Sequence, residues 1–215
     1  VYDANAKRVI AELDDVFGFN WSEDGEGVLY SSAVVDTQNN RNINRVHRFD
    51  WQSEVNHTLY VYPDNAVFIG VSPAPKGGCF LGVKVNYGDT LMLYLNSEGK
   101  ATRLSSGKGF FEYIGEKNGR CYFSTDENAP MGHVLSIAAQ DVEREGALVD
   151  GFAVALAEMD ASLESVGLTD EGILAVHSRN ACSEMALYSF EGKKLREIAM
   201  PSEYGAISTG GTMEF

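Results

Sequence analysis

The chain repeats the same short pattern four times, and this repetition limits the folds open to it more than any other feature. Four apolar, β-rich segments each follow a glycine-bearing turn, and their starts are 51, 42 and 52 residues apart. Such turns need residues that tolerate a positive φ, as glycine and asparagine do. The four segments begin at Val28, Cys79, Cys121 and Ile173.

Three further series of apolar segments run in step with the first. They start at Val46, Leu91, His133 and Met185, then at Thr58, Ala101, Ala147 and Leu195, and, ahead of the turns, at Phe17, Phe68, Phe110 and Leu163. Each repeat therefore predicts four short strands. A four-stranded unit that recurs at this period is typical of a β-propeller blade.

The predicted fold is all-β, a propeller of four-stranded antiparallel blades. One such sheet cannot bury both of its faces alone, whereas stacked blades bury them and leave only short edges. We predict a single domain over residues 1–215 that has four full blades and a partial-blade strand at each end. The blades span approximately residues 17–62, 67–106, 110–150 and 162–201, and the terminal strands span 1–10 and 206–215. Two arrangements are open, an arc cut from a larger propeller and a five-bladed ring that the terminal strands close.

Two stretches depart from the strand pattern. In Ala4–Phe17 the apolar residues Val9, Ile10, Leu13 and Phe17 have helical spacing, which predicts an amphipathic helix. Gly151–Leu163 is rich in alanine and also favours a helix. This second stretch lies between the third and fourth repeats, so an insertion between blades is the alternative.

Composition excludes several classes of function. The chain has 17 basic and 31 acidic residues, a net charge of −14, which repels phosphate backbones, and it shows no basic patch. We therefore expect no nucleic-acid partner. No apolar run reaches the roughly 18 residues of a membrane helix, so we expect no membrane partner either. The first ten residues lack the layout of a signal peptide.

The cysteines and histidines do not form a metal or redox motif. Cys79, Cys121 and Cys182 have no CxxC spacing, which indicates free thiols and a cytoplasmic location. Cys79 and Cys121 occupy matching repeat positions, so we expect both to be small, buried core residues. The four histidines have no second ligand at helical or strand spacing, so we predict neither a metal site nor a cofactor. They are His47, His57, His133 and His177.

Three stretches carry a more specific pattern. The first combines an aromatic strand, a glycine turn, an apolar strand and an Ala-Pro pair, in Tyr113, Ile114, Gly115, Tyr122, Phe123, Thr125, Asp126, Ala129, Pro130 and Leu135. The second is the Trp-Ser-x-Asp-Gly-x-Gly run of Trp21, Ser22, Asp24, Gly25 and Gly27, and the third is residues 188–208. In this order they resemble the N-terminal propeller domain of the prolyl oligopeptidase (prolyl endopeptidase) family of serine peptidases. The match is incomplete at both ends of that propeller.

The resemblance implies an endopeptidase parent that cleaves after proline, but this chain lacks the family's catalytic elements. No G-x-S-x-G nucleophile turn occurs, and the alternating strands and helices of a hydrolase domain are absent from the sequence. The nearest candidate serine, Ser208 in Gly205–Gly210, has a different spacing. We therefore predict no catalytic residues in this chain and no activity on its own.

The resemblance also implies partners and a role. The propeller would gate access of short proline-containing peptides to an α/β-hydrolase domain that this chain does not include. Exposed blade edges would allow self-association. A free-standing propeller that binds a protein or ligand is the alternative, because one fold supports many functions.

Other candidate chemistry has a simpler structural explanation. His177 alternates along a strand, so we expect it to be packed. Acidic pairs such as Asp14 with Asp15, and Glu158 with Asp160, are ordinary on a surface. The Gly107–Phe111 run lacks the register of a phosphate loop.

Two further positions concern substrate binding. The resemblance implies a substrate-contacting aromatic where this chain has Leu29, and a second contact near Tyr87. Neither is assigned, and the substrate-binding residues stay unknown.

Overall fold

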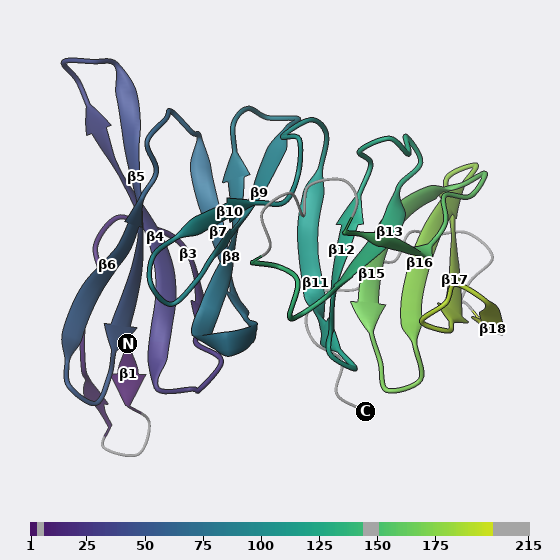
Figure 1. The fold of residues 1–215 in the computed structure, drawn as a ribbon, viewed down its shortest axis with the longest axis horizontal. Coiled ribbons are helices and arrows are strands. Elements are labelled where there is room, and N and C mark those ends of the chain that lie inside the picture. The colour runs from purple at the N-terminus through teal and green to yellow at the C-terminus, as the bar shows by residue number, and fades with distance from the viewer. Residues whose placement is uncertain (4–6, 144–150, 200–215) are drawn as a thin grey trace. The chain divides into compact units, whose positions relative to one another are not determined.

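The computed structural model describes residues 1–3, 7–143 and 151–199 of the chain. It contains four four-stranded antiparallel sheets and one two-stranded sheet (Figure 1). The prediction of an all-β fold with four-stranded blades is confirmed. The chain divides into two compact units, Val1–Lys108 with Glu143, and Gly109–Val142 with the described residues after 150. The prediction of a single domain over the whole chain stays a prediction.

Unit 1 contains the first two sheets, which we call blades 1 and 2. Blade 1 has the order β3 (Val16–Trp21), β4 (Gly27–Asp36), β5 (Arg41–Asp50) and β6 (Val55–Val61). Blade 2 consists of β7 (Phe68–Ala74), β8 (Gly78–Lys84), β9 (Thr90–Leu95) and β10 (Ala101–Arg103). A single 3₁₀ turn, η1 (Pro75–Gly77), joins β7 to β8.

Blades 1 and 2 pack face to face. The side-chain amide of Asn20 in β3 donates a hydrogen bond of 2.7 Å to the carbonyl of Val71 in β7. Buried aliphatic side chains and one cysteine fill the space between the blades, including Leu29, Val46, Ile69, Val71, Cys79, Leu81, Val83, Leu93 and Leu95. Burial of this apolar surface is the main stabilising contribution in unit 1.

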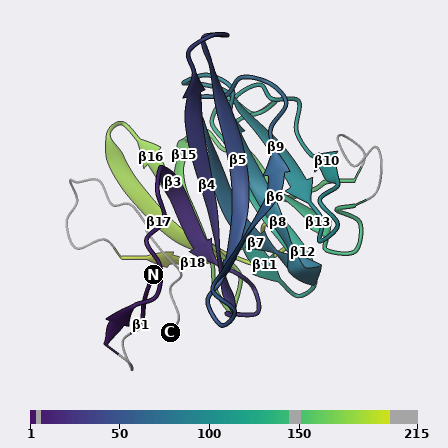
Figure 2. The same ribbon diagram turned by 90° about the vertical axis from the view of Figure 1, so that its left-hand side faces the viewer.

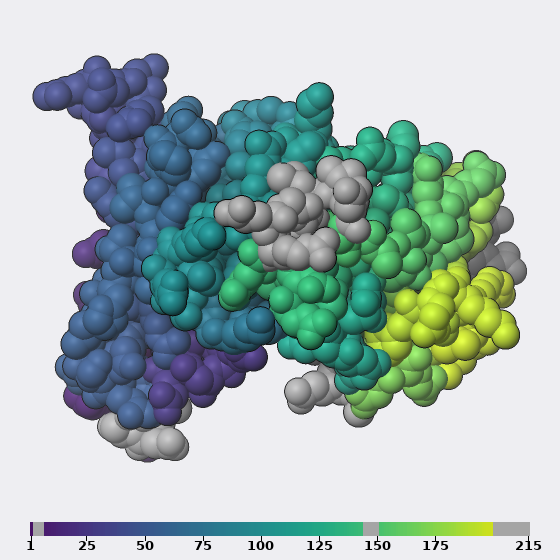
Figure 3. All heavy atoms as spheres, in the orientation of Figure 1, coloured from purple at the N-terminus to yellow at the C-terminus, as the bar shows by residue number. Residues whose placement is uncertain are grey.

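The hairpin of β4 and β5 is longer than its counterparts. Its strands pair from Gly27↔Asp50 to Asp36↔Arg41, whereas β6 reaches only Val61↔Arg45. The tip of the hairpin therefore extends beyond the rest of blade 1 (Figures 1 and 3).

Unit 2 contains blades 3 and 4, built in the same strand order. Blade 3 has β11 (Phe111–Lys117), β12 (Arg120–Thr125), β13 (His133–Ala138) and β14 (Ala153–Leu156). Blade 4 has β15 (Ser162–Leu168), β16 (Ile173–Arg179), β17 (Cys182–Tyr188) and β18 (Lys194–Ile198). Their shared core comprises Tyr122, Val134, Ala155, Leu156, Ile173, Ala175, Ala186 and Tyr188.

The prediction of a helix over Ala4–Phe17 is wrong in the described part of that stretch. Arg8–Val9 is a strand, β2, which pairs with β1 (Tyr2–Asp3) as a separate two-stranded sheet. Strand β3 then begins at Val16 and alternates in period two through Phe17, Phe19 and Trp21. Pairing with β4 decides this outcome, because tertiary contacts override a weak local helix preference.

The prediction of a helix over Gly151–Leu163 is also wrong. Ala153–Leu156 is β14, the fourth strand of blade 3, and its buried Ala155 and Leu156 contribute to the core of unit 2. The stretch is therefore not an insertion between blades. The strand that the sequence placed at Ala147, and the terminal strand 206–215, lie outside the described residues. In the described residues no helix is long and apolar enough to cross a membrane.

Candidate functional site

The Trp21–Gly27 motif forms the turn between β3 and β4. The backbone N–H of Ser22 donates to the carbonyl of Gly27 at 2.9 Å, and Gly27 N–H donates back to Ser22 Oγ at 2.9 Å. Gly25 has a φ of 69°, which glycine adopts without strain. A Cβ on Gly27 would lie 2.9 Å from the carbonyl oxygen of Phe49, so a side chain there would collide with β5. The turn thus explains Ser22, Gly25 and Gly27 of the motif.

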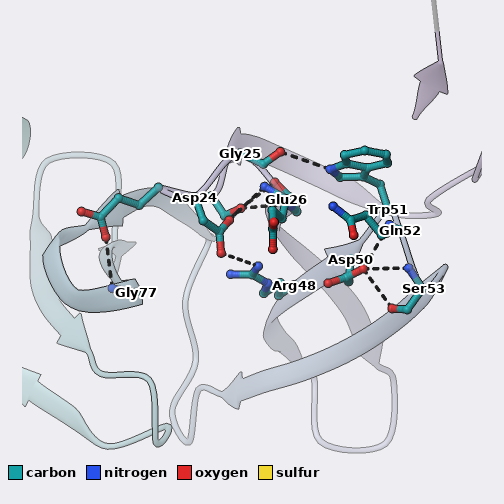
Figure 4. A network of polar contacts seen from close by, with 12 residues as sticks. Asp24, Gly25, Glu26, Arg48, Asp50, Trp51, Gln52, Ser53 and Gly77 are labelled. Atoms are coloured by element: carbon teal, nitrogen blue, oxygen red, sulfur yellow. Dashed lines mark hydrogen bonds and ion pairs between the residues drawn. The ribbon is translucent and has the colours of Figure 1, made fainter. Parts of the chain in front are cut away.

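Asp24 connects this turn to β5. Its carboxylate accepts hydrogen bonds from Ser22 Oγ (2.5 Å), Arg48 (2.8 Å) and the Glu26 N–H (2.9 Å). These bonds, led by the one from Ser22, hold the pKa of Asp24 well below its ordinary value. Figure 4 shows Asp24 and Arg48 facing each other. An aspartate fixed as an anion by three donors stabilises the turn and is not free to act as an acid or base.

The same network reaches the next blade. Glu23 accepts a hydrogen bond of 3.1 Å from the N–H of Gly77, which lies in η1 of blade 2 (Figure 4). On the other side, the indole N–H of Trp51 donates to the carbonyl of Gly25 at 3.1 Å. The turn is therefore bonded to η1 of blade 2 and to Trp51, which follows β5 in blade 1.

A cleft of about 420 Å³ opens between blades 1 and 2 beside this network. Its apolar lining residues are Leu29, Leu59, Cys79 and Leu95. The polar lining residues are Ser22, Glu23, Asp24, Arg48, Asn96 and Ser97, with Gly77 and Gly78. The volume falls in the range of small-molecule sites, about 300–1,000 Å³.

The sequence identified part of this lining and missed the rest. Ser22 and Asp24 belong to the recognised motif, whereas Glu23, Asn96 and Ser97 were not singled out. The repeat itself could have indicated them, because it places the turns after β3 and β9 at the same end of successive blades. Among Ser22, Asp24 and Arg48, the hydrogen bonds run to one another or to backbone. The cleft is therefore chiefly a contact region between blades 1 and 2.

A second polar cluster lies within blade 1. His47 Nε2 shares a hydrogen bond of 2.9 Å with Ser32 Oγ, and His47 Nδ1 one of 3.2 Å with Thr58 Oγ1. The ring of Tyr30 stacks on the imidazole at 4.7 Å. Burial, with a smaller contribution from Arg45, lowers the pKa of His47, so the imidazole is neutral.

The pair of Ser32 and His47 resembles half of a catalytic triad but lacks the rest. In a triad an acid orients the histidine, whereas here that place is taken by the Thr58 hydroxyl. Both Ser32 and His47 are buried. The hydrogen bonds of this cluster satisfy polar side chains on one face of blade 1. Sequence reasoning missed it, because Ser32 and His47 lie 15 residues apart on different strands.

The buried cysteines are confirmed as core residues. Cys79 and Cys121 are both free and buried, at 2% and 0% exposure. Burial raises the pKa of each thiol to about 12, so both are neutral and unreactive at physiological pH. Cys182 is also free and is only half-buried.

The remaining candidates do not converge on a site in the described residues. His177 is buried against Tyr188, with ring centroids 6.2 Å apart. Glu158 accepts from the Met131 N–H, while Asp160 pairs with Arg179, so this acidic pair is divided between two partners. Asp14 and Asp15 are exposed ahead of β3, and Gly107–Phe111 leads into strand β11 with no helix.

The two positions implied for substrate binding differ in their exposure to solvent. Leu29 is 4% exposed and belongs to the core of unit 1. Tyr87 is 98% exposed in the turn between β8 and β9. Ser208 lies outside the described residues. Within the described residues, no three His, Cys, Asp or Glu side chains gather as metal ligands.

The repeated four-stranded sheets and their face-to-face packing define a protein with β-propeller blades. Comparison with solved structures makes this more specific. A prolyl endopeptidase, solved in a study of two such enzymes and their inter-domain dynamics, superimposes with a TM-score of 0.74 over 94% of this chain at 17% identity. Prolyl oligopeptidase B from Galerina marginata, without ligand, gives 0.68 over 90% at 20% identity.

These structures are much longer than the present chain. The chain spans 31% of the prolyl endopeptidase and 28% of the Galerina enzyme. Its fold is that of the propeller of prolyl oligopeptidases. No protein-family model and no curated protein sequence matches the chain.

Proposed function

We propose that the chain is the noncatalytic propeller part of a prolyl oligopeptidase-like serine peptidase. The observation that carries the proposal is the likeness to solved prolyl endopeptidases over 94% of the chain but only 31% of theirs. Sequence motifs from three separate stretches support the same parent. In this proposal the serine, aspartate and histidine of the reaction reside in a hydrolase domain outside these 215 residues.

The propeller's role in the proposal is steric. It covers the hydrolase domain and admits short proline-containing peptides while excluding larger chains. The free thiols Cys79, Cys121 and Cys182 favour a reducing compartment, the cytoplasm. Exposed outer strands such as β6 would be the route for self-association of the chain on its own.

A binding module without a hydrolase is the second candidate. It rests on the fold alone, because one fold supports many functions and the polar residues lining the cleft between blades 1 and 2 bond chiefly to one another or to backbone. The two candidates differ in one decisive respect, the presence of a nucleophilic serine in the native protein.

The test compares the 215-residue chain with the protein made from its native reading frame. Each is treated with a serine-reactive fluorophosphonate and with a chromogenic acyl-Gly-Pro substrate. We expect the native protein to be labelled outside residues 1–215 and to release the chromophore, and the 215-residue chain to do neither. A native protein with no reactive serine would favour the binding module, and labelling of Ser208 would contradict both candidates.

The gating role needs a separate measurement on the native protein. A short proline-containing peptide and an unfolded protein containing the same sequence are offered at equal concentration. We expect cleavage of the peptide and protection of the protein. Equal cleavage of both would refute gating while leaving the peptidase assignment intact.

A further inference from the structure

Two hairpin turns of unit 2 consist of only two residues each, and both begin with asparagine. Asn118 and Gly119 join β11 to β12, and Asn180 and Ala181 join β16 to β17. All four residues are exposed and have a positive φ, of 54° and 70° in the first turn and 52° and 63° in the second. The strand pairs can be followed in Figures 1 and 2. The two turns therefore differ chiefly in whether the second residue carries a Cβ.

This difference controls a reaction of asparagine side chains. The backbone nitrogen of the following residue attacks the side-chain carbon Cγ of the asparagine. A bond forms between that nitrogen and Cγ, the bond from Cγ to Nδ2 breaks, and Nδ2 leaves as ammonia with the proton that the backbone nitrogen loses. Water then opens the succinimide ring at either carbonyl, which leaves aspartate or isoaspartate. A side chain on the attacking residue hinders the approach, so an asparagine followed by glycine reacts fastest.

The backbone nitrogen of Gly119 is well placed for this attack. Asn118 and Gly119 form the only Asn-Gly pair among the 215 residues. A Cβ built on Gly119 would meet no atom within 4 Å, so the space beside the reacting groups is open. The exposed end of a hairpin also opens locally at little cost in free energy, and this opening gives the Asn118 side chain the rotation that the attack requires.

Other asparagines in turns with a positive φ lack this combination. Asn40 precedes Arg41 and Asn128 precedes Ala129, so in both cases the attacking nitrogen belongs to a residue with a side chain. The N–H of Ala129 also donates a hydrogen bond of 3.1 Å to the carbonyl of Asp126. We therefore expect these asparagines to react more slowly than Asn118.

We propose that Asn118 is a site of spontaneous deamidation, at which the protein acquires an additional carboxylate in blade 3. The new carboxylate adjoins Lys117, whose ammonium pairs with Asp170 in the turn between β15 and β16. It competes with Asp170 for that ammonium, and isoaspartate also lengthens a two-residue turn by one backbone atom. The reaction needs only water, so the proposal does not depend on the proposed function.

Peptide mapping by mass spectrometry measures the reaction. The native protein is incubated at neutral and at mildly alkaline pH, and the conversion of each asparagine is followed with time. We expect Asn118 to deamidate about tenfold or more faster than Asn180, because the glycine nitrogen has no neighbouring Cβ. The rate should rise with pH, because the deprotonated nitrogen is the nucleophile. Equal rates at Asn118 and Asn180, or no conversion of Asn118, would overturn the proposal.

An exchange of the second residues of the two turns provides matched variants. Gly119→Ala should suppress the reaction at Asn118, and Ala181→Gly should introduce it at Asn180. Both variants should fold, because the chain already contains each of the two pairs in a two-residue turn with a positive φ at both positions. If Gly119→Ala leaves the rate at Asn118 unchanged, the Gly119 nitrogen is not the nucleophile and the proposal is wrong.

Discussion

Units 1 and 2 have the same strand order but fill the space between their blades with different side chains. In unit 1 the second strands of the two blades contribute Leu29 and Leu81, two large aliphatic residues. At the equivalent positions unit 2 has Tyr122 and Ala175, one large and one very small. All four are at most 4% exposed. The comparison indicates that the repeat preserves apolar burial at these positions and not the identity or size of either residue.

Removing the large member of the pair in unit 2 should give the largest effect. Tyr122→Ala removes a large side chain from the core that it shares with Ala175, and it removes the contact with Phe190, whose ring lies 5.6 Å from that of Tyr122. We expect a loss of about 3–5 kcal/mol in the free energy of unfolding. Denaturant titration measures it, and hydrogen exchange should place the loss in β12 and β16. A loss below that of Leu29→Ala would contradict the role assigned to Tyr122.

Replacing Ala175 by a larger residue tests whether the side chains at positions 122 and 175 are complementary in size. Ala175→Leu should overpack unit 2 and cost about 1–3 kcal/mol. Adding Tyr122→Leu recreates the Leu–Leu pair of unit 1, so the double variant should be more stable than the sum of the two single effects predicts. Strict additivity of the two changes in denaturant titrations would mean that the two positions do not share one volume.

The sequence was sufficient where a strand and its turn carried a local signal. The segments after Val28, Cys79, Cys121 and Ile173 are all second strands of blades, because each follows a turn with glycine and has a continuous apolar run. The sequence failed at Ala153–Leu156, where alanine and leucine suit a helix equally well. Only pairing with β13 makes that segment a strand.

The polar network around Asp24 also shows which contacts the sequence does not predict. The Trp21–Gly27 motif is readable from the sequence, because its residues are adjacent, and Ser22, Asp24, Gly25 and Gly27 each satisfy a need of the turn. Its partners are not, since Arg48 lies 24 residues from Asp24 and Gly77 lies 54 residues from Glu23. Such contacts depend on how strands and blades are brought together, and no local pattern encodes them.

The cysteines provide a test of burial in the two units for which we expect a smaller change in stability. Cys79→Ser places a hydroxyl at a site that is 2% exposed, and we expect it to cost about 1–3 kcal/mol. Cys182→Ser changes a half-buried residue and serves as the control, with an effect within about 0.5 kcal/mol. Thermal melts of both variants measure the difference. In the unmodified native chain a bulky thiol reagent should react mainly with Cys182, and rapid modification of all three thiols would contradict the burial of Cys79 and Cys121.

The smallest effect is expected at Asp24, and its sign can be derived from the pKa. The ordinary pKa is 3.8 and folding lowers it, so the ionised carboxylate stabilises the fold above the unfolded value. That stabilisation is lost as the pH falls below about 4 toward the lower pKa of the folded state. Asp24→Asn weakens the hydrogen bonds from Ser22 and Arg48, and because the side chain is about half exposed we expect a cost of only about 1 kcal/mol at neutral pH.

This cost should itself depend on pH. Between neutral pH and about pH 5 the difference in unfolding free energy between the native chain and Asp24→Asn should be constant, because Asp24 is ionised in both folded and unfolded states. Below about pH 4 the unfolded state binds a proton that the folded state does not, so the difference should shrink. Asp14→Asn is the control, since Asp14 is exposed ahead of β3 and its carboxylate makes no hydrogen bond or ion pair within the described residues. A difference that stays constant down to pH 3 would mean that the charge of Asp24 contributes nothing, and that the turn depends on its hydrogen-bond geometry alone.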